Sequence, residues 1–348
     1  MSERSGILAG GNWIVDKLKV IDVYPQQDAL ANILEESIGN GGSPFNILLD
    51  LAKLGVDFSL SGIGRIGDDA DGHWILDECK NHGIDTQQLR SHADVPTSHT
   101  DVMTVRDTGR RTFFHQRGAN AFLSDTDFCF EKTTARIFHL GYLLLLDGLD
   151  APDSEFGTVA ARVLHRARAA GCRTSIDVVS EDSDRFADIV LPALPHVDYC
   201  ILNEFEIERS TGIPTRPNGR LDLSAIQKAA RQLLEKGVKA WVIVHFPEGA
   251  YALGANGEEC AQGSIYMPQE KIISTVGAGD AFAAGVLYGL HEDFSIQDSL
   301  CHGVSIAAAS LQGIGTSNGI NKLSDCLALG KIHGFRNLPF RLSTVRDA

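Results

Sequence analysis

Residues 274–290 read Ser-Thr-Val-Gly-Ala-Gly-Asp-Ala-Phe-Ala-Ala-Gly-Val-Leu-Tyr-Gly-Leu and carry the strongest structural signal in this chain of 348 residues. Gly277, Ala278 and Gly279 form a turn of small residues that leads into Asp280 and a stretch that is apolar or small on every side. This pattern predicts a buried helix. The free backbone N–H groups and the positive dipole end at its amino terminus, beside a loop with little side-chain bulk, predict an anion-binding hole.

Asp280 stands at the mouth of this predicted hole. A carboxylate beside a bound phosphate is repulsive, so its presence needs a chemical reason. As a general base it takes the proton of an attacking hydroxyl, while the neighbouring amides hold the charge of a transferring phosphoryl group. The alternative is a structural role, because Asp is favoured at helix amino termini. The local sequence leaves both interpretations open.

The composition is that of a folded, acidic protein. Hydrophobic residues make up 43% of the chain, and 31 Lys and Arg against 45 Asp and Glu give a net charge of −14. That charge argues against nucleic acid as a partner, since binding to a phosphate backbone needs a basic field. The seven cysteines contain no C-x-x-C pair, and no apolar run resembles a signal peptide or a membrane span. These features predict a cytoplasmic protein without membrane association.

Helical and strand patterns alternate along most of the chain. An apolar face of helical period over residues 45–52 ends at Gly55, a helix stop signal. Further helices are predicted at residues 74–80, 159–169 and 186–191, and strands at residues 56–60, 137–140, 174–178, 199–202 and 240–244. This alternation predicts an α/β fold with a doubly wound, mostly parallel central sheet flanked by helices.

Two regions without intervening helices predict a second, smaller sheet. Strand patterns occur at residues 17–23 and 33–38, and strands at 99–106 and 111–116 flank a turn sequence. We therefore predict one α/β domain over residues 1–334, with a β lid contributed by about residues 14–39 and 97–117, and an unassigned tail at 335–348. Lid strands with an apolar face often pair between subunits, which predicts a homodimer through the lid.

The 274–290 segment resembles the C-terminal signature of the ribokinase-like (PfkB) carbohydrate kinase family, which is Asp-Thr-Thr-Gly-Ala-Gly-Asp followed by a helix of small residues. Residues 41–55 begin with Gly-Gly-Ser-Pro-Phe-Asn and resemble the family's N-terminal di-glycine signature. The order and separation of the two signatures match the family, and further similarity runs from Gly10 to about Gly315. The resemblance implies a ribokinase-like fold and transfer of the γ-phosphate of ATP to a hydroxyl of a sugar or related polyol.

The resemblance also implies roles for single residues. Asp280 is the base that activates the hydroxyl, and Gly277, Ala278 and Gly279 form the anion hole. The implied substrate site consists of Asn12, Asp16, Gly41, Gly42 and Asn46. These residue types suit the task, because Asn offers a donor and an acceptor to a diol and Gly lets the backbone approach a ligand closely. Without the resemblance, Asp16 is interpreted as a solvated turn residue.

The positions implied for the nucleotide lie in the second half of the chain. Asn203 and Glu206 match the family's Asn-x-x-Glu motif, which organises magnesium and phosphate, with Glu206 acting on Mg²⁺ through water. Gly249 remains in the segment that matches the nucleotide loop, and His302 lies in a segment that resembles the helix lining the adenine pocket. Each has a structural alternative, since acidic first turns of helices are common and a single His is more often only packed.

Two departures from the family pattern limit what carries over. Ser274 stands where the family has Asp, and Val276 stands where it has Thr, at positions that help to build a monovalent-cation site. A neutral hydroxyl and an aliphatic side chain argue against potassium activation. Residues 244–250 also differ from the family's Thr- and Gly-rich nucleotide loop, which leaves the nucleotide preference open.

Two other functions are compatible with this scaffold, namely a nucleoside kinase of the same family and a non-catalytic sugar or nucleotide sensor. A nucleoside needs an aromatic or apolar shelf, for which the candidates are Trp13, Phe45 and Phe114. A phosphosugar needs a cation at its far end, for which the candidates are Arg106, Arg111 and Arg117.

An NAD-dependent oxidoreductase is the remaining alternative. Residues 62–67 read Gly-Ile-Gly-Arg-Ile-Gly, which fits a dinucleotide-binding fingerprint. However, Asp68 and Asp69 stand where the pyrophosphate would meet a helix, and their charges would repel it. The pattern also follows an earlier strand-helix unit instead of opening the fold, so the sequence argues against this function.

Overall fold

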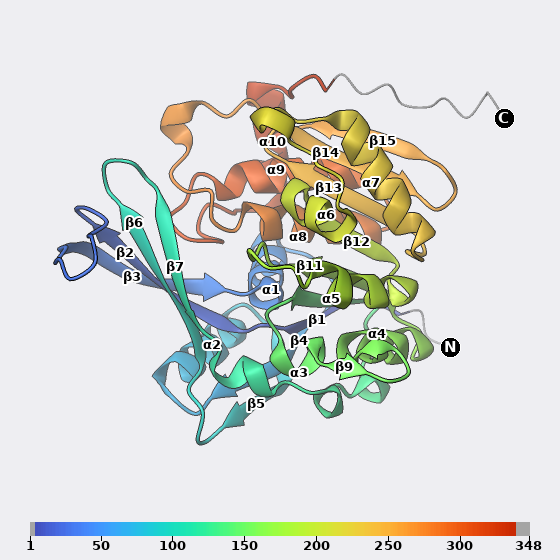
Figure 1. The fold of residues 1–348 in the computed structure, drawn as a ribbon, viewed down its shortest axis with the longest axis horizontal. Coiled ribbons are helices and arrows are strands. Elements are labelled where there is room, and N and C mark those ends of the chain that lie inside the picture. Colours follow the sequence, from blue (N-terminus) through green and yellow to red (C-terminus); the bar gives the residue numbers. More distant parts are fainter. Residues whose placement is uncertain (1–3, 339–348) are drawn as a thin grey trace.

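The computed structural model describes residues 4–338 of the chain (Figure 1). Nine strands form one large sheet with the order β15 (Glu259–Gly263), β14 (Gly249–Gly254), β13 (Trp241–Phe246), β12 (Tyr199–Asn203), β11 (Arg173–Val178), β8 (Ile137–Leu143), β1 (Ile7–Gly11), β4 (Leu60–Gly67) and β5 (Asp85–His92). The strands from β13 to β5 run parallel to one another. At the other edge, β13, β14 and β15 form an antiparallel meander.

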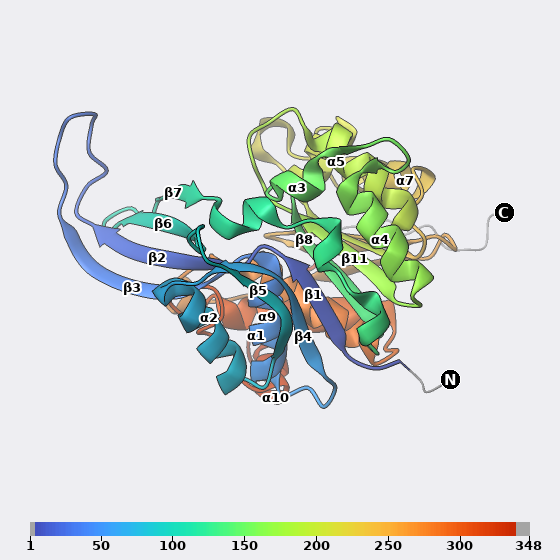
Figure 2. The same cartoon turned by 90° about the horizontal axis from the view of Figure 1, so that it is seen from below.

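Helices cover both faces of this sheet (Figure 2). Strand β1 shows the reason, since Leu8 packs into one hydrophobic core while Ile7 and Ala9 pack into the other. The face of Leu8 is covered by α3 (Asp147–Asp150), the short strands β9 (Pro152–Asp153) and β10 (Gly157–Thr158), α4 (Val159–Ala169), α5 (Phe186–Ala193), α6 (Glu204–Thr211) and α7 (Leu223–Glu235). The opposite face is covered by α1 (Ser43–Leu54), α2 (Ala70–Asn81), α8 (Ala278–His291), α9 (Ile296–Ser310) and α10 (Leu323–His333).

The doubly wound architecture predicted from the sequence is confirmed. The helical pattern at 45–52 corresponds to α1, and Gly55 ends that helix in the left-handed conformation with φ 78°. The strands predicted at residues 137–140, 174–178, 199–202 and 240–244 correspond to β8, β11, β12 and β13. Period and breaker residues predict these elements well because each is buried on one or both faces.

The strand predicted at 56–60 is displaced, because the chain forms β4 from Leu60 to Gly67. The first two glycines of the dinucleotide-like pattern, Gly62 and Gly64, therefore lie inside a strand, while Gly67 ends the strand ahead of α2. Trp13 explains them, since a Cβ atom at Gly62 would lie 2.4 Å from its ring and one at Gly64 would lie 2.1 Å from it. These glycines make room for a buried indole, and the fingerprint does not mark a nucleotide site.

Residues 244–250, interpreted from the sequence as a nucleotide loop, belong to two strands. Strand β13 ends at Phe246, which pairs with Gly249 at the start of β14. Strands β14 and β15 escape the sequence analysis because their residues are mostly small or polar and lack a strong β propensity. Pairing with the large sheet and burial under α9 decide their conformation.

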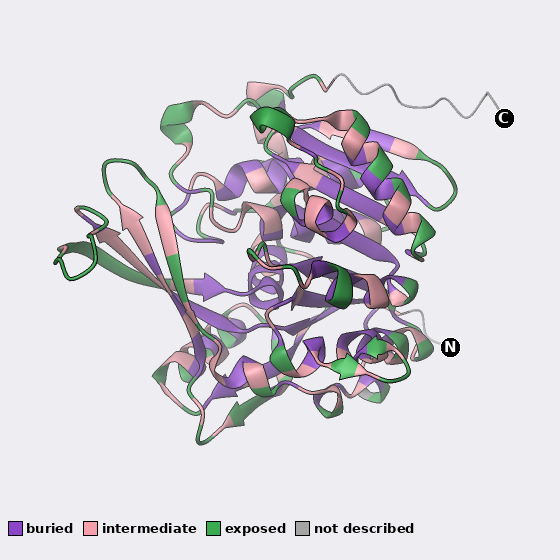
Figure 3. Cartoon of the chain, viewed as in Figure 1, coloured by how far each residue is buried: buried purple, intermediate pink, exposed green. Residues whose placement is uncertain are grey.

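A separate four-stranded sheet stands beside the carboxyl ends of the parallel strands, at the left of Figure 1. Its order is β3 (Ile33–Gly41), β2 (Ile14–Ile21), β6 (Ser98–Val105) and β7 (Arg111–Gln116). This is the small sheet predicted from the sequence, although β2 begins at Ile14 and not at residue 17. The outer part of β3 is exposed along residues 33–38 (Figure 3). We call this four-stranded sheet the lid.

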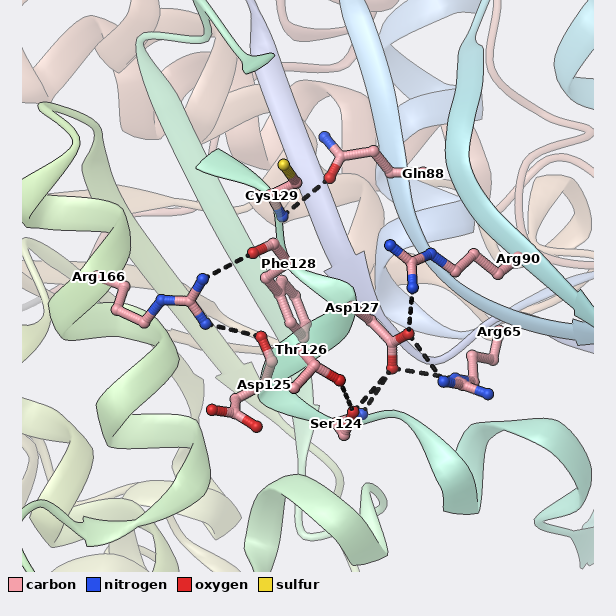
Figure 4. Close-up of polar contacts among 10 residues, drawn as sticks. All are labelled: Arg65, Gln88, Arg90, Ser124, Asp125, Thr126, Asp127, Phe128, Cys129 and Arg166. Atoms are coloured by element: carbon pink, nitrogen blue, oxygen red, sulfur yellow. Dashed lines mark hydrogen bonds and ion pairs between the residues drawn. The ribbon is translucent and has the colours of Figure 1, made fainter. Parts of the chain in front are cut away.

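A buried ion pair ties the edge of the large sheet to the segment that follows the lid (Figure 4). The Asp127 carboxylate has no exposed surface and accepts hydrogen bonds from Arg65 Nε and Nη2, both at 2.9 Å. It also accepts one from Arg90 Nη1 at 3.3 Å and two from Ser124. Because Arg65 lies on β4 and Arg90 lies on β5, these bonds fasten the segment to two neighbouring strands.

The described chain continues past the end of α10 at His333. Phe335 forms a bridge with Ile265, and the Arg336 N–H donates to the Ser264 carbonyl at 2.8 Å. The first residues of the predicted tail thus pack against the segment that follows β15, and residues 339–348 of that tail lie outside the described residues. Within residues 4–338, we find no helix with the length and apolarity needed to cross a bilayer.

Candidate active site

Two adjoining cavities lie at the carboxyl ends of the parallel strands, the edge where α/β sheets bind ligands. The first has a volume of about 750 Å³ and is lined by residues of the lid and of these strand ends. The second has a volume of about 480 Å³ and is lined by residues of β13, α8 and α9. Four residues line both cavities, namely Asn203, His245, Thr275 and Gly279. The amino terminus of α8 therefore stands where the two cavities meet.

Glycines shape this amino terminus. Gly277 adopts φ 77°, and a Cβ atom there would lie 2.6 Å from the backbone of Thr316. A Cβ atom at Gly279 would lie 3.2 Å from the His245 ring. Gly277 and Gly279 line the first cavity, and Ala278 and Gly279 line the second. The structure thus brings all three residues of the predicted anion hole to the junction, with the first-turn amides of a buried helix beside them.

Asp280 is buried in the first turn of α8, and two neighbours hold its carboxylate. The Tyr142 hydroxyl lies 2.8 Å from Oδ1 and 2.7 Å from Oδ2, and the Asn46 amide donates to Oδ2 at 2.7 Å. Burial and the negative charge of Asp177 raise the pKa of Asp280 to about 6, while the bonds from Asn46 and Tyr142 oppose that shift. The carboxylate is thus mostly deprotonated at neutral pH and can accept a proton from a bound hydroxyl.

Asp16 faces the same cavity from β2. Burial and the negative charge of Asp280 raise the pKa of Asp16 to about 8, while a hydrogen bond with Thr100 lowers it. Gly41 lies directly beside this carboxylate, because a Cβ atom at Gly41 would be 2.4 Å from Asp16 Oδ1. Gly42 adopts φ 84° and also lines the cavity. Asp16, Gly42 and Asn46 therefore share one cavity with Asp280, and Gly41 leaves the space that the Asp16 side chain occupies.

Asn12 does not join this set, which corrects the substrate-binding role implied for it. Its side chain is wholly buried, and both ends of its amide are engaged by backbone groups. Its oxygen accepts from the Tyr142 N–H at 2.6 Å, and its nitrogen donates to the Leu145 carbonyl at 3.0 Å. Asn12 therefore holds the end of β8, which carries Tyr142, and it does not line the cavity.

Asn203 and Glu206 form a reciprocal cap at the start of α6. The Glu206 N–H donates to Asn203 Oδ1 at 2.9 Å, and the Asn203 N–H donates to Glu206 Oε2 at 2.8 Å. Ser180 adds a hydrogen bond to Glu206 Oε1 at 2.7 Å. Burial raises the pKa of Glu206 to about 8. Asn203 and Glu206 thus have the structural role at a helix start that the sequence also allowed. Both residues line the first cavity as well.

Asp177, at the end of β11, is a cavity residue that the sequence analysis missed. Its Oδ2 atom accepts a hydrogen bond from Ser43 Oγ at 2.6 Å, whereas Oδ1 is buried and has no hydrogen-bond partner within the described part of the chain. Together with Glu206 and Asn203 it lines the cavity with oxygen donors. Within residues 4–338, no three His, Cys, Asp or Glu side chains form a group that could hold a metal.

The second cavity is bounded mainly by apolar and small side chains. Gly249 lines it, as the sequence analysis implies, and a Cβ atom there would lie 2.3 Å from the Gln262 carbonyl oxygen. The face of α9 that lines it carries Val304, Ala307 and Ala308. His302 is not on that face.

The placement of His302 corrects its predicted position near an adenine base. Its ring packs against Tyr288 at 5.5 Å and Phe294 at 5.3 Å between centroids. It precedes Val304 by two residues, which turns a helical side chain by roughly 200° away from the cavity face. The resemblance places the helix correctly, but the rotation of α9 decides which of its side chains face the ligand.

Several cavity residues escape the sequence analysis. Tyr142 and Asp177 follow apolar strand patterns, and a polar residue at the carboxyl end of a predicted parallel strand is the signal that could find them. Thr100 and His115 lie on neighbouring lid strands, with 3.0 Å between Thr100 Oγ1 and His115 Nδ1. Nothing in a short sequence window identifies such a pair. Trp13 and Phe45, suggested as a shelf for a base, are buried in the core.

A lidded α/β fold whose buried helix begins with a carboxylate between two cavities is that of a phosphotransferase acting on a small molecule. The model of the pfkB family of carbohydrate kinases matches residues 13–323. The chain belongs to this family, which confirms the resemblance carried by the two glycine signatures.

Known relatives support this assignment, and a solved structure has a similar fold. The 5-dehydro-2-deoxygluconokinase of Shouchella clausii (strain KSM-K16) is 25% identical over 299 residues, which are 83% of this chain and 85% of that protein. The 2-dehydro-3-deoxygluconokinase of Bacillus subtilis (strain 168) is 26% identical over 291 residues, which are 82% and 84% of the two chains. The structure of Arabidopsis thaliana ribokinase complexed with ribose and ATP is similar in fold, with a TM-score of 0.76 at 23% identity, and the match covers 94% of this chain and 98% of that one.

Proposed function

We propose that this protein transfers the γ-phosphate of ATP to a hydroxyl of a sugar or related polyol, with Asp280 as the general base. One observation carries the proposal. Asp280 lies in the first turn of α8 and lines the same cavity as Asp16 and Asn46. A hydroxyl held by Asp16 and Asn46 is then next to a base that is deprotonated at neutral pH and next to amides that attract phosphoryl oxygens.

The proton and the phosphoryl charge have separate acceptors in this arrangement. Asp280 takes the hydroxyl proton, and the amides of Gly277, Ala278 and Gly279 stabilise the negative charge that spreads over the transferring group. ATP occupies the second cavity, with its terminal phosphate at the junction formed by Thr275 and Gly279. Closure of the lid excludes water and so limits hydrolysis of ATP.

The residues around Glu206 suit a magnesium ion. Asp177 Oδ1 is a buried oxygen without a protein partner among the described residues, and Asn203 and Glu206 add oxygen donors beside it. Mg²⁺ prefers oxygen ligands and keeps several waters, so we assign these residues to hold Mg²⁺ largely through water. When bound, the ion supplies neutralisation of phosphate charge.

Three further properties belong to this proposal. Ser274 and Val276 support activity without potassium. Exposed apolar side chains on the lid and on its β2–β3 connection support a homodimer that pairs two lids, and they include Val23, Tyr24, Leu30, Ile33, Ile38, Phe113 and Phe114. Analytical ultracentrifugation tests the dimer, and a purely monomeric protein at micromolar concentration contradicts it.

All seven cysteines are free thiols, which supports a reducing, cytoplasmic location.

A coupled ADP-release assay tests the function. The panel contains pentoses, hexoses, phosphosugars, nucleosides and the two deoxygluconates for which the bacterial relatives are named, each with and without potassium. We expect ADP release that depends on one class of sugar and does not depend on potassium. Release with nucleosides alone identifies a nucleoside kinase instead. Binding of ATP without release on any compound identifies a sensor and overturns the proposal.

A further inference from the structure

Arg111 is the first residue of lid strand β7. The side chains of this strand point alternately toward the cavity and toward the opposite face of the lid. Arg111, Phe113 and His115 line the first cavity and Phe114 does not, although both phenylalanines are exposed. Among the residues of the described range 4–338 that line this cavity, Arg111 is the only Lys or Arg. The two histidines that line it are neutral at pH 7, because burial lowers the pKa of His115 and of His245 to about 4.

The Arg111 guanidinium reaches from the lid to the loop that precedes α8. Its Nη1 atom lies 3.3 Å from Thr275 Oγ1, and its Nη2 atom lies 3.3 Å from Ser274 Oγ. Thr275 lines both cavities and is followed within two residues by Gly277. The cation is thus fixed against the loop that forms the anion hole, where the sugar cavity and the nucleotide cavity meet.

Both partners of this guanidinium are neutral hydroxyls. Within the described part of the chain no carboxylate lies at ion-pair distance from Arg111, whereas Arg106 and Arg117, which flank the lid strands, pair with Glu35 and Asp147. Burial lowers the pKa of Arg111. A half-buried cation without a counter-charge is costly unless an anion joins it. The position of Arg111 therefore points to an anionic ligand at the junction of the cavities.

We propose that Arg111 binds the non-bridging oxygens of the phosphoryl group during its transfer, and this inference rests on the proposed kinase function. The sugar oxygen forms a bond to the γ-phosphorus as the bond from that phosphorus to the bridging oxygen of ADP breaks. The hydroxyl proton goes to Asp280. Arg111 only donates hydrogen bonds, and its guanidinium geometry matches two oxygens of a phosphoryl group. Because the cation comes from the lid, a closed lid completes the charge stabilisation that the α8 amides begin.

Steady-state kinetics of Arg111→Met and Arg111→Lys test this role, with Arg110→Met as the matched control. Arg110 is the neighbouring exposed residue of the same hairpin and does not line either cavity. We expect Arg111→Met to lower kcat roughly 10²–10³-fold for every accepted sugar, as loss of a donor to transition-state charge does, with KM for the sugar unchanged. Arg111→Lys retains part of the rate because it keeps the charge, and added guanidinium ion restores part of the rate to Arg111→Ala.

Binding of ADP with and without aluminium fluoride, measured by calorimetry, supplies a second readout, because this complex mimics the transferring group. We expect aluminium fluoride to tighten ADP binding in the wild type and in Arg110→Met but not in Arg111→Met. ADP alone should bind the wild type and both variants equally. Equal thermal unfolding of the variants excludes misfolding.

The outcomes separate the two proposals. A wild type that is inactive on the whole panel refutes the kinase function. An active wild type with an equally active Arg111→Met refutes the role of Arg111. If Arg111→Met raises KM only for sugars with an anionic group and leaves kcat unchanged, then Arg111 recognises the sugar, and the proposed contact with the transferring group is wrong.

Discussion

The hydroxyl of Tyr142 lies within 2.8 Å of both carboxylate oxygens of Asp280. The two residues are 138 positions apart in the chain and come from the end of β8 and the first turn of α8. The phenol donates to the carboxylate, which stabilises the negative charge against burial. Asp280 is therefore a buried base whose pKa is raised by burial and by Asp177, and hydrogen bonds from Asn46 and Tyr142 oppose that rise.

Removal of this hydrogen bond by Tyr142→Phe is expected to raise the pKa of Asp280 further above its present value of about 6. A general base works in its deprotonated form, so activity is present above its pKa and is lost as pH falls through it. The acid limb of the kcat profile should thus move to higher pH. A kcat series on either side of pH 6 measures the shift, with exposed Tyr24→Phe as the control, and an unmoved limb would separate Tyr142 from the base.

Substitution of the base itself by Asp280→Asn keeps the shape of the side chain and removes its ability to take a proton. We expect turnover to fall by roughly two to four orders of magnitude, as is typical for the loss of a general base. Sugar binding, measured by calorimetry, should largely survive. Asp298→Asn, an exposed acid in the first turn of α9, is the control. Near-normal turnover in Asp280→Asn removes Asp280 from the mechanism.

The Asp16 carboxylate depends on the absence of a side chain at Gly41. In Gly41→Ala the new Cβ atom would lie 2.4 Å from Asp16 Oδ1, so the carboxylate must move. We expect KM for the sugar to rise roughly 10- to 100-fold, the effect of leaving a buried sugar hydroxyl without its hydrogen-bond partner. Gly39→Ala is a close control, because Gly39 lies on the same strand and pairs with Asp16, but its Cβ atom would meet nothing nearer than 3.7 Å. Equal KM values for the two variants would contradict the role of Asp16.

The Asp127 ion pair is a structural device remote from the chemistry. We expect Asp127→Asn to lower the free energy of unfolding by roughly 2–4 kcal/mol, toward the lower end for a buried pair because Arg65 and Arg90 both reach solvent. Urea denaturation measures the change, and kcat should stay at the wild-type value. Asp125→Asn, which breaks a partly exposed pair with Arg162, should cost less than about 1 kcal/mol. Equal losses in the two variants would rule out a special contribution from Asp127.

Motif residues with a local physical purpose were the most predictable part of the site. Asp280 and Gly277 act through the start of one helix, so a short window of sequence already describes their surroundings. Asn12 shows the limit, because its amide bonds to the backbone of Tyr142 at the end of β8 and of Leu145 just beyond that strand. His302 shows the same limit, since the rotation of α9 turns its ring away from the cavity.

By itself, the sequence determined the alternation of strands and helices, the separate lid, and the small-residue helix start with its carboxylate. These features follow from apolar period, turn residues and backbone freedom, which act over a few neighbouring positions. Only the tertiary structure decided that Tyr142 holds Asp280, that Arg111 reaches Ser274 and Thr275, and that Gly62 and Gly64 accommodate an indole. Those contacts join residues far apart in the chain, and side-chain directions across packed elements exist only once the sheet, helices and lid are assembled.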